Sequence, residues 1–265
     1  MAISTVSEIA AALAIAQRMR FIKNITAPKG AGAFQSAWLG TGFPGAGTAP
    51  PIYTAGTGYT CSRTTTGALA QANGAVKNWI ARLQAAVTEP GVLFIADRLW
   101  HCGQIPFGAG TYAITTPGAL PARITDNGVG CELWVEQDAA AGAASGTLTA
   151  NYTNTASASK AGVIAAVVSA PVIGQMQCVP LVAGDLGVKT LVSVVTSDTW
   201  TSGTFGMTIL KTHAQIEIPG ANMGVTQDWS KVLVTIPADA CLFFYFLANS
   251  ANAPVALGTA WVIDK

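Results

Sequence analysis

The chain has 265 residues, of which only 10% are Asp, Glu, Lys or Arg, whereas these residues make up about a quarter of ordinary globular domains. The formal net charge is +1, and 51% of the residues are hydrophobic. This balance excludes a basic surface for nucleic acid, because a phosphate backbone is held by clustered Lys and Arg. Surface charge keeps soluble chains apart, so we expect much of the surface to be buried against other subunits.

A short helix is predicted at the start of the chain, within residues 1–23. Thr5-Val6-Ser7-Glu8 fits a capping box, in which the Thr5 hydroxyl and the Glu8 carboxylate satisfy backbone amides at a helix start. Apolar residues then recur at the spacing of one helix face, at Ile9, Ala12, Leu13, Ala16 and Met19. Glu8, rather than a positive charge, precedes this apolar run, so no signal peptide is predicted.

Residues 24–90 are predicted to form an extended arm. The Gly- and Pro-rich stretches at 29–33 and 42–51 cannot form long regular elements. A solvated linker has no need of aromatic side chains, whereas an arm that lies on a neighbouring surface uses them as anchors. The predicted anchors are Phe34, Trp38, Phe43, Tyr53, Tyr59 and Trp79. Within this region, Ala75–Ala86 fits either a second short helix or an extended segment.

Residues 91–265 are dense in strand patterns. Short runs with a period of two are separated by clusters of Gly, Pro, Asn, Asp and Ser, which predicts an antiparallel sandwich or barrel and favours a jelly-roll-like β-sandwich. The chain is therefore mainly β, with a helix at 1–23, an arm at 24–90 and a sandwich domain at 91–265. The predicted strands are Gly91–Leu99, Val129–Gln137, Gly146–Thr153, Val163–Val168, Gly174–Val182, Val188–Thr196, Thr204–Lys211, Ala214–Ile218, Val232–Ile236, Leu242–Leu247 and Val255–Ile263.

No membrane span is predicted. A spanning helix needs about twenty nearly unbroken apolar residues. The most apolar later stretch, residues 161–182, is interrupted by Pro171, Gly174, Gln175 and Pro180.

Neither a metal nor a cofactor is predicted. His101-Cys102 is the only adjacent pair of strong metal ligands, and a structural zinc usually needs four ligands with close pairwise spacing. The five cysteines are far apart and form no CxxC pair, so they read as reduced, partly buried thiols rather than as a disulfide scaffold.

Asp97-Arg98, which follows the apolar run Val92–Ile95, is the other charged pair of interest. A catalytic base requires a partner held nearby, and the few acids and two histidines specify no such set. We therefore expect Asp97 and Arg98 to form an intrachain or intersubunit ion pair that fixes a strand end, and we expect no enzyme. A depolymerase in particular would need carboxylates clustered in a cleft.

Several turn-and-strand segments, taken together, resemble virion structural proteins of tailed bacteriophages, in the class that includes capsid-decorating (cement) proteins. The resemblance covers roughly residues 91–211, carries no catalytic motif and does not extend to the C-terminal segment. The segments are Asp97–Gly103, Ile124–Gly130 with Glu132–Trp134, Leu148–Asn154, Pro180–Val188 and Gly203–Lys211.

The resemblance implies a protein that decorates the outer surface of the capsid in many copies. Its partners would be the major capsid protein and further copies of itself, as a homotrimer, with assembly in the cytoplasm of the bacterial host. The alternative is a tail or head-fibre spike protein that binds host-surface glycans. Aromatic faces stack on sugars, although core packing is their more frequent use; the residues concerned are Trp134, Tyr152, Trp200 and Trp229.

Overall fold

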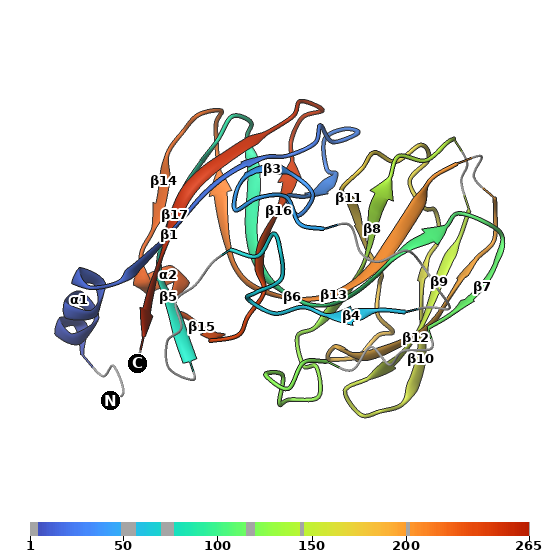
Figure 1. Cartoon of the computed structure of the whole chain (residues 1–265), viewed down its shortest axis with the longest axis horizontal. Helices are drawn as coiled ribbons and strands as arrows, with labels where there is room; N and C mark the ends of the chain where they lie inside the picture. Colours follow the sequence, from blue (N-terminus) through green and yellow to red (C-terminus); the bar gives the residue numbers. More distant parts are fainter. Residues whose placement is uncertain are drawn as a thin grey trace.

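The computed structural model describes residues 5–48, 57–69, 77–114, 120–143, 146–199 and 202–264. Over these residues the fold is mainly β, and every strand pairing is antiparallel. Helix α1 (Val6–Ala14) precedes the first strand, and the short helix α2 (Trp229–Val232) lies near the C-terminus. Figure 1 shows the strands gathered into three sheets, which we call sheets A, B and C.

Sheet A contains six strands. Its order is β14 (Val225–Gln227), β5 (Lys77–Val87), β17 (Val255–Asp264), β1 (Gln17–Asn24) and β3 (Thr41–Phe43), and β15 (Val234–Pro237) also pairs with β5. Sheet C contains four strands, in the order β10 (Ser159–Ile164), β9 (Leu148–Asn154), β12 (Val188–Thr196) and β7 (Gly110–Ala113). In the view of Figure 1 sheet A lies at the left and sheet C at the right.

Sheet B lies between them and closes on itself. Its order is β13 (Thr204–Ile218), β8 (Glu132–Ala139), β11 (Gln175–Cys178), β2 (Phe34–Ser36), β16 (Leu242–Ala248) and β6 (Gly91–Pro106), and β6 pairs back with β13. The short strand β4 (Tyr59–Thr60) is added to β6. The β6–β13 pairing runs from Gly91↔Ile218 to Thr204↔Pro106 with three register shifts, so both strands span the molecule.

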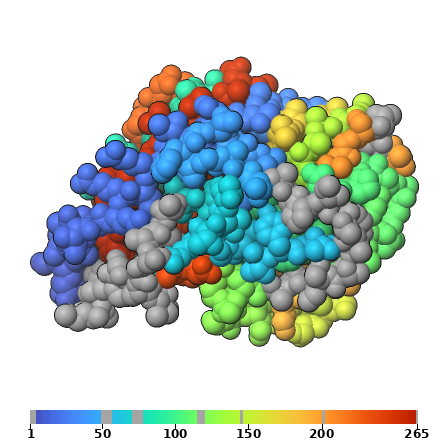
Figure 2. All heavy atoms as spheres, viewed as in Figure 1, coloured from blue at the N-terminus to red at the C-terminus, as the bar shows by residue number. Residues whose placement is uncertain are grey.

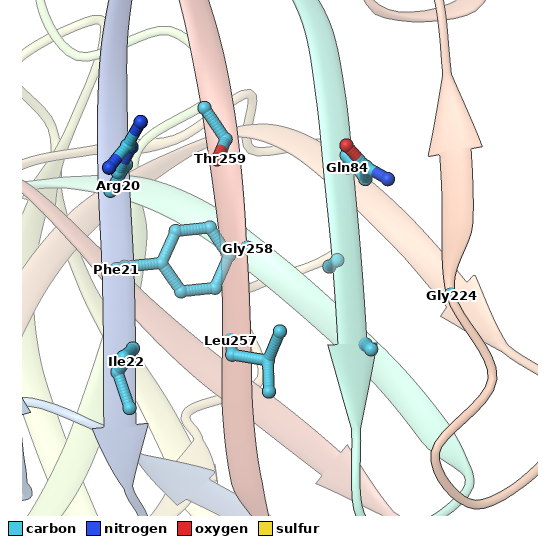
Figure 3. Close-up of a pocket in the computed structure, with 10 residues that line it drawn as sticks. Arg20, Phe21, Ile22, Gln84, Gly224, Leu257, Gly258 and Thr259 are labelled. Atoms are coloured by element: carbon cyan, nitrogen blue, oxygen red, sulfur yellow. The ribbon is translucent and has the colours of Figure 1, made fainter.

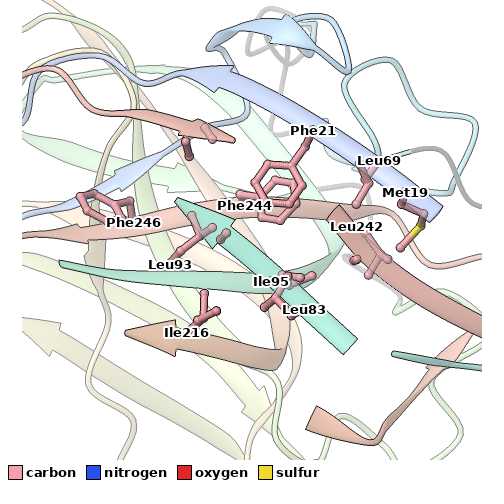
Figure 4. Close-up of a cluster of buried hydrophobic side chains, with 14 of the residues drawn as sticks. Met19, Phe21, Leu69, Leu83, Leu93, Ile95, Ile216, Leu242, Phe244 and Phe246 are labelled. Carbon is pink, nitrogen blue, oxygen red and sulfur yellow. The ribbon is translucent and has the colours of Figure 1, made fainter. Parts of the chain in front are cut away.

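The first hydrophobic core lies between sheet A and one half of sheet B (Figure 4). Alternation along β16 explains its composition, because Leu242, Phe244 and Phe246 enter this core while the residues between them face the other way. Phe21 of β1 meets Phe244 with ring centroids 4.1 Å apart. Each large side chain buried here stabilises the fold by about 1.5–3 kcal/mol relative to exposure.

Two further cores complete the interior. The second joins sheet C to the other half of sheet B, where Tyr152 of β9 and Phe205 of β13 are both fully buried. The third is rich in aromatic side chains of sheet B and its neighbours. They include the stacked pair Phe94 and Tyr245, whose ring centroids are 4.6 Å apart and whose ring planes differ by 4°. Because β6 and β13 contribute to all three cores, they tie the two outer sheets together.

The predicted mainly β, antiparallel class is confirmed. Most predicted strands are present with shifted ends: the first continues to Pro106, and the two predicted between 204 and 218 are one strand. The sequence of Ala75–Ala86 fits either a helix or an extended segment, and in the structure Lys77–Val87 is a strand. Its pairing with β17 satisfies backbone groups along the whole segment, which excludes the helical alternative.

The N-terminal helix is present but shorter than residues 1–23. The capping box forms as predicted, with Thr5 N donating to Glu8 Oε2 at 3.1 Å and Glu8 N donating to Thr5 Oγ1 at 3.3 Å. The helix ends at Ala14, and Gln17–Asn24 is strand β1. Buried Met19 and Phe21 alternate there with exposed Arg18, Arg20 and Ile22, so residues beyond the helix follow the period of two that is typical of a strand.

The structure shows no extended arm in the described parts of residues 24–90. These parts, 24–48, 57–69 and 77–90, contribute β2 to the closed sheet, β3 and β5 to sheet A, and β4 to the edge of β6. Trp38 is buried within its own chain, where its indole N–H donates to Thr48 O at 3.2 Å. Trp38 therefore packs in the interior of its own chain instead of serving as an anchor on a neighbouring surface.

Candidate functional site

The outer face of sheet A carries a continuous row of exposed apolar side chains. Ile22 of β1 is in register with Phe43 of β3 on one side and Leu257 of β17 on the other. Cross-strand partners point to the same face of a sheet, so the three side chains are neighbours. Phe43 is 58% exposed, Ile22 54% and Leu257 48%. Contiguous exposed apolar side chains of this kind mark interaction surfaces.

A groove of about 370 Å³ runs beside this row (Figure 3). Its far wall is the next outward row of the sheet, in which Arg20, Thr259 and Gln84 are in register. Gly258 lies between the two rows and pairs with Phe21. A Cβ at Gly258 would lie 2.2 Å from the Gln84 carbonyl oxygen and 2.5 Å from Phe21 Cζ, so only glycine fits this position.

Positive charge lies along one side of the groove, the side that Arg20 lines. Arg18 and Arg82 both pair with Trp261 in the third outward row, and the Arg82 guanidinium lies 5.6 Å from the Trp261 ring centroid. Together with Arg20 they place three exposed guanidinium groups on this face. None of the residues in these three rows is acidic. The acidic residue nearby is Asp228, which follows β14 and whose pKa is lowered first by hydrogen bonds from Ser230 and then by the charge of Arg82. The face therefore combines apolar contact area with a local excess of positive charge, in a chain whose formal net charge is only +1.

Lys23 holds the loop that presents Phe43. Its side chain is buried, and the ammonium donates to the carbonyl oxygens of Gly40 at 2.8 Å, Pro44 at 3.2 Å and Gly45 at 3.3 Å. Burial lowers the pKa of Lys23 to about 8. These hydrogen bonds hold the backbone on both sides of Phe43 in place, so Phe43 is fixed in the apolar row.

A buried ionic network lies inside sheet B, at the middle of β6. Arg98 forms an ion pair with Glu136 of β8 at 2.6 Å, and both side chains are almost completely buried. Arg98 Nη2 also lies 2.6 Å from His101 Nδ1. A guanidinium only donates, so Nδ1 accepts and His101 is neutral. Burial and the Arg98 charge lower the pKa of His101 well below its usual value.

Thr208 and Asp138 complete this network. Thr208 of β13 donates to Glu136 Oε2 at 3.1 Å, which links β13 to β8. Asp138 accepts from the Gln104 backbone N–H at 2.6 Å and lies 3.9 Å from His101 Nε2. Burial raises the pKa of Asp138 to about 7. These groups are enclosed by the closed sheet, so the network positions strands and offers no surface at which a substrate could react.

Asp97 forms a second ion pair, on the other side of the same strand. Arg123 Nε and Nη2 each lie 2.8 Å from an Asp97 carboxylate oxygen, which gives a bidentate pair. Asp97 also accepts from the Cys241 backbone N–H at 2.8 Å. Of the two alternatives for Asp97 and Arg98, the structure shows intrachain ion pairs. They lie within β6 rather than at its end, because the strand continues for eight residues beyond Arg98, to Pro106.

The other predicted contact residues occupy different places. Phe34 and Tyr59 are partly buried against the third core, which also contains Trp38, and Trp79 is half-buried on β5. Phe43 alone among the described anchors is exposed. Tyr53 lies outside the described residues.

Sequence reasoning missed Ile22 and Leu257, which complete the exposed row. The signal was present for Ile22, since residues 18–23 alternate charged and apolar side chains up to Phe21 and then break the alternation with Ile22. For Leu257 no local signal distinguishes an exposed residue from a core residue. Its exposure follows from its register with Ile22, which is a long-range pairing.

The aromatic residues considered for sugar binding are largely inside. Trp134 is 4% exposed and Tyr152 is fully buried, each within a hydrophobic core. Trp229 is half-buried on α2, and Trp200 lies outside the described residues. Trp134 and Tyr152 therefore offer no face to a glycan in this structure.

Neither described helix has the length and hydropathy of a membrane-spanning segment. Within the described ranges, no group of three or more His, Cys, Asp or Glu residues is arranged to hold a metal ion. Comparisons of the chain with protein-family models, with curated proteins and with solved structures found no significant match.

Proposed function

We propose that this chain is a bacteriophage capsid decoration protein that binds the head shell through the outer face of sheet A. The observation that carries the proposal is the exposed row of Phe43, Ile22 and Leu257 beside the groove. The low overall charge and the sequence resemblance described above agree with it. The jelly-roll-like sandwich and the homotrimer belong to the same proposal, and no catalytic role is included.

The chemistry of the face indicates the chemistry of its partner. Burying an apolar side chain contributes about 25 cal/mol per Å² removed from water, so three adjacent side chains give a useful contact in every copy. The three arginines favour a shell surface with acidic side chains around an apolar centre.

Binding of purified protein to heads prepared without it tests the proposal. Leu257→Lys places a charge in the apolar row, and we expect co-sedimentation with heads to weaken by at least about tenfold, since a lost side-chain burial of 1.5–3 kcal/mol corresponds to that factor or more. The matched control is Val192→Lys on sheet C, where Val192 is similarly exposed at 47%. This control should bind like the wild type.

Equal binding by wild type and Leu257→Lys would refute the proposed contact. Light scattering of the free proteins distinguishes a contact with the shell from a contact between copies of the chain, because it measures the oligomeric state in solution. If Leu257→Lys breaks an oligomer in solution and leaves binding of the monomer to heads intact, the row is a contact between copies and the shell contact is wrong. Thermal unfolding of both variants checks that the substitutions leave the fold intact.

A further inference from the structure

Two of the five cysteines lie side by side in the interior. Cys61 follows β4 and Cys241 precedes β16, and both are fully buried in the third core. The Cys241 thiol is hydrogen-bonded to the Cys61 sulfur. Both thiols are free.

Strand β6 sets this arrangement. β4 and β16 both pair with β6 and meet end to end along it: the Cys61 backbone N–H donates to Leu99 O at 3.0 Å, and the Cys241 carbonyl accepts from Arg98 N at 2.9 Å. The two cysteines thus face consecutive residues of one strand, and consecutive strand residues are about 3.3 Å apart. Two segments that end beside consecutive residues of one strand bring their terminal residues together, which a disulfide requires, since its two Cα atoms lie about 4.4–6.8 Å apart.

The Asp97–Arg123 ion pair fixes both cysteine backbones. Asp97 Oδ1 accepts from the Cys241 N–H at 2.8 Å, and Arg123 Nη2 donates to the Cys61 carbonyl oxygen at 2.8 Å. One bidentate pair therefore holds the two residues in register across 180 positions of sequence. This is the same pair that the sequence indicated through Asp97 alone.

The surroundings of Cys61 favour its thiolate. Its pKa is lowered by the hydrogen bond from Cys241 and by the positive charges of Arg98 and Arg123, against the opposing effect of burial. Arg98 Nε and Nη1 are buried and have no hydrogen-bond partner among the described residues. The pKa of Cys241 is raised, first by its hydrogen bond to Cys61 and then by burial, so Cys61 is the thiol of the pair that ionises more readily. Thiolates are the nucleophiles of disulfide exchange.

We propose that Cys61 and Cys241 form a redox-active dithiol that closes to a disulfide and locks the segment 57–69 onto sheet B. The inference is independent of the proposed function. Segment 57–69 is otherwise held by the short pairing of β4 with β6 and by non-covalent contacts such as Leu69 N to Leu242 O at 2.7 Å. The disulfide replaces a hydrogen bond between the two sulfurs with a covalent bond.

The oxidant is a small disulfide such as oxidised glutathione. The Cys61 thiolate attacks one of its sulfur atoms, which forms a mixed disulfide and releases one glutathione thiolate. Cys241 then gives up its proton and attacks the Cys61 sulfur, which forms the protein disulfide and releases the second glutathione. The protein loses two protons and two electrons, and one glutathione disulfide takes them up to become two glutathione molecules. Because both thiols are buried, local opening of segment 57–69 precedes the reaction.

Oxidation of the folded full-length chain by oxidised glutathione, followed by alkylation and mass spectrometry of non-reduced peptides, tests the proposal. We expect peptides linked through Cys61 and Cys241, and a loss of two hydrogen atoms from the protein that a reducing agent reverses. Cys178 is exposed and should become glutathionylated first, so the experiment is repeated in Cys178→Ser to remove that background. The linked form should unfold at a higher denaturant concentration than the reduced form.

The single variants give a sharper readout. Cys241→Ser should accumulate the mixed disulfide at Cys61, since no second thiol displaces glutathione, whereas Cys61→Ser should lose no hydrogen atoms. Cys102→Ser removes another buried thiol and should link like the wild type. If the wild-type protein forms no 61–241 link under conditions that fully modify Cys178, or forms it only in denaturant, the proposal is wrong. That outcome does not depend on whether the variants fold.

Discussion

Sheets A and C both pack on the closed sheet B, but their outer faces differ. On sheet C many polar side chains of the outer face bind one another, as in Asn151 Nδ2 to Ser193 Oγ at 2.9 Å and Thr153 Oγ1 with Thr190 Oγ1 at 2.5 Å. Its exposed apolar side chains, Val163 and Val192, lie on β10 and β12, two strands that do not pair with each other. On sheet A the outward rows combine three adjacent apolar side chains with exposed arginines and neutral polar residues. Sheet C therefore offers a partner separate apolar side chains among polar groups that already pair within the chain, whereas sheet A offers contiguous apolar area beside positive charge.

The largest effect is expected from a substitution that weakens sheet B, which joins sheets A and C. Glu136→Ala removes the partner of the buried Arg98, and leaving such a charge unpaired costs about 3–5 kcal/mol. We expect chemical denaturation to show that loss in one transition, because β6 and β13 belong to all three cores. Two separate transitions would show that sheets A and C belong to independent units. The double variant Arg98→Met with Glu136→Leu should recover much of the stability.

A smaller effect concerns the pH dependence of that connection. Asp138 has a pKa raised by burial to about 7 in the folded state, against about 3.9 in an unfolded chain. The folded state therefore holds the proton more tightly, and this group makes the protein less stable as the pH rises from about 4 to 7. Between pH 5 and pH 8 the loss should be on the order of 2 kcal/mol.

Asp138→Asn should remove this loss, and the difference between wild type and variant in denaturant titrations at both pH values measures it. Buried histidines act in the opposite direction, since burial lowers the pKa of His213 to about 4 and its stabilising effect is lost as the pH falls. That contribution is common to both proteins and cancels. A variant with the same pH dependence as the wild type would contradict the assignment to Asp138.

The smallest effect is local to sheet C. The Tyr152 hydroxyl donates to Asp185 Oδ2 at 2.6 Å and accepts from Val182 N at 2.9 Å. Tyr152→Phe removes both bonds, and we expect a loss of about 1–2 kcal/mol in the free energy of unfolding. Binding to heads should not change, because this contact lies on the half of the molecule away from sheet A. Weaker binding by this variant would contradict the assignment of the head contact to sheet A alone.

Local patterns predicted the elements well, and long-range pairings explain the rest. The capping box at Thr5 and Glu8 involves neighbours in sequence, and it forms as expected. The strand at Gln17–Asn24 was hidden because Met19 fits both a helical and an alternating pattern. Asp97 and Arg98 were identified as ion-pair residues, but their partners, Arg123 and Glu136, come from separate segments that only the closure of sheet B brings near.

Long-range pairing also explains why only part of the candidate surface on sheet A could be predicted from the sequence. Phe43 was singled out as an aromatic anchor, whereas its neighbours in the exposed row come from β1 and β17, at opposite ends of the chain. A register between strands that distant is set by the whole fold, not by either segment. The sulfur pair at Cys61 and Cys241 likewise follows from two strands that meet along β6.

The closure of sheet B and the shortness of the outermost strands of sheet A bear on how copies of the chain can crowd together. Exposed strand edges invite pairing with a second chain, and short edge strands discourage it. The ring strands of sheet B pair on both sides, and sheet A ends in β3 and β14, with three residues each. At sheets A and B, neighbouring copies on a densely covered surface would therefore meet face to face, where contacts are reversible, and would have little opportunity to join through their backbones into fibres. Sheet C leaves β10 and β7 as its edges, so backbone pairing between copies would have to begin there.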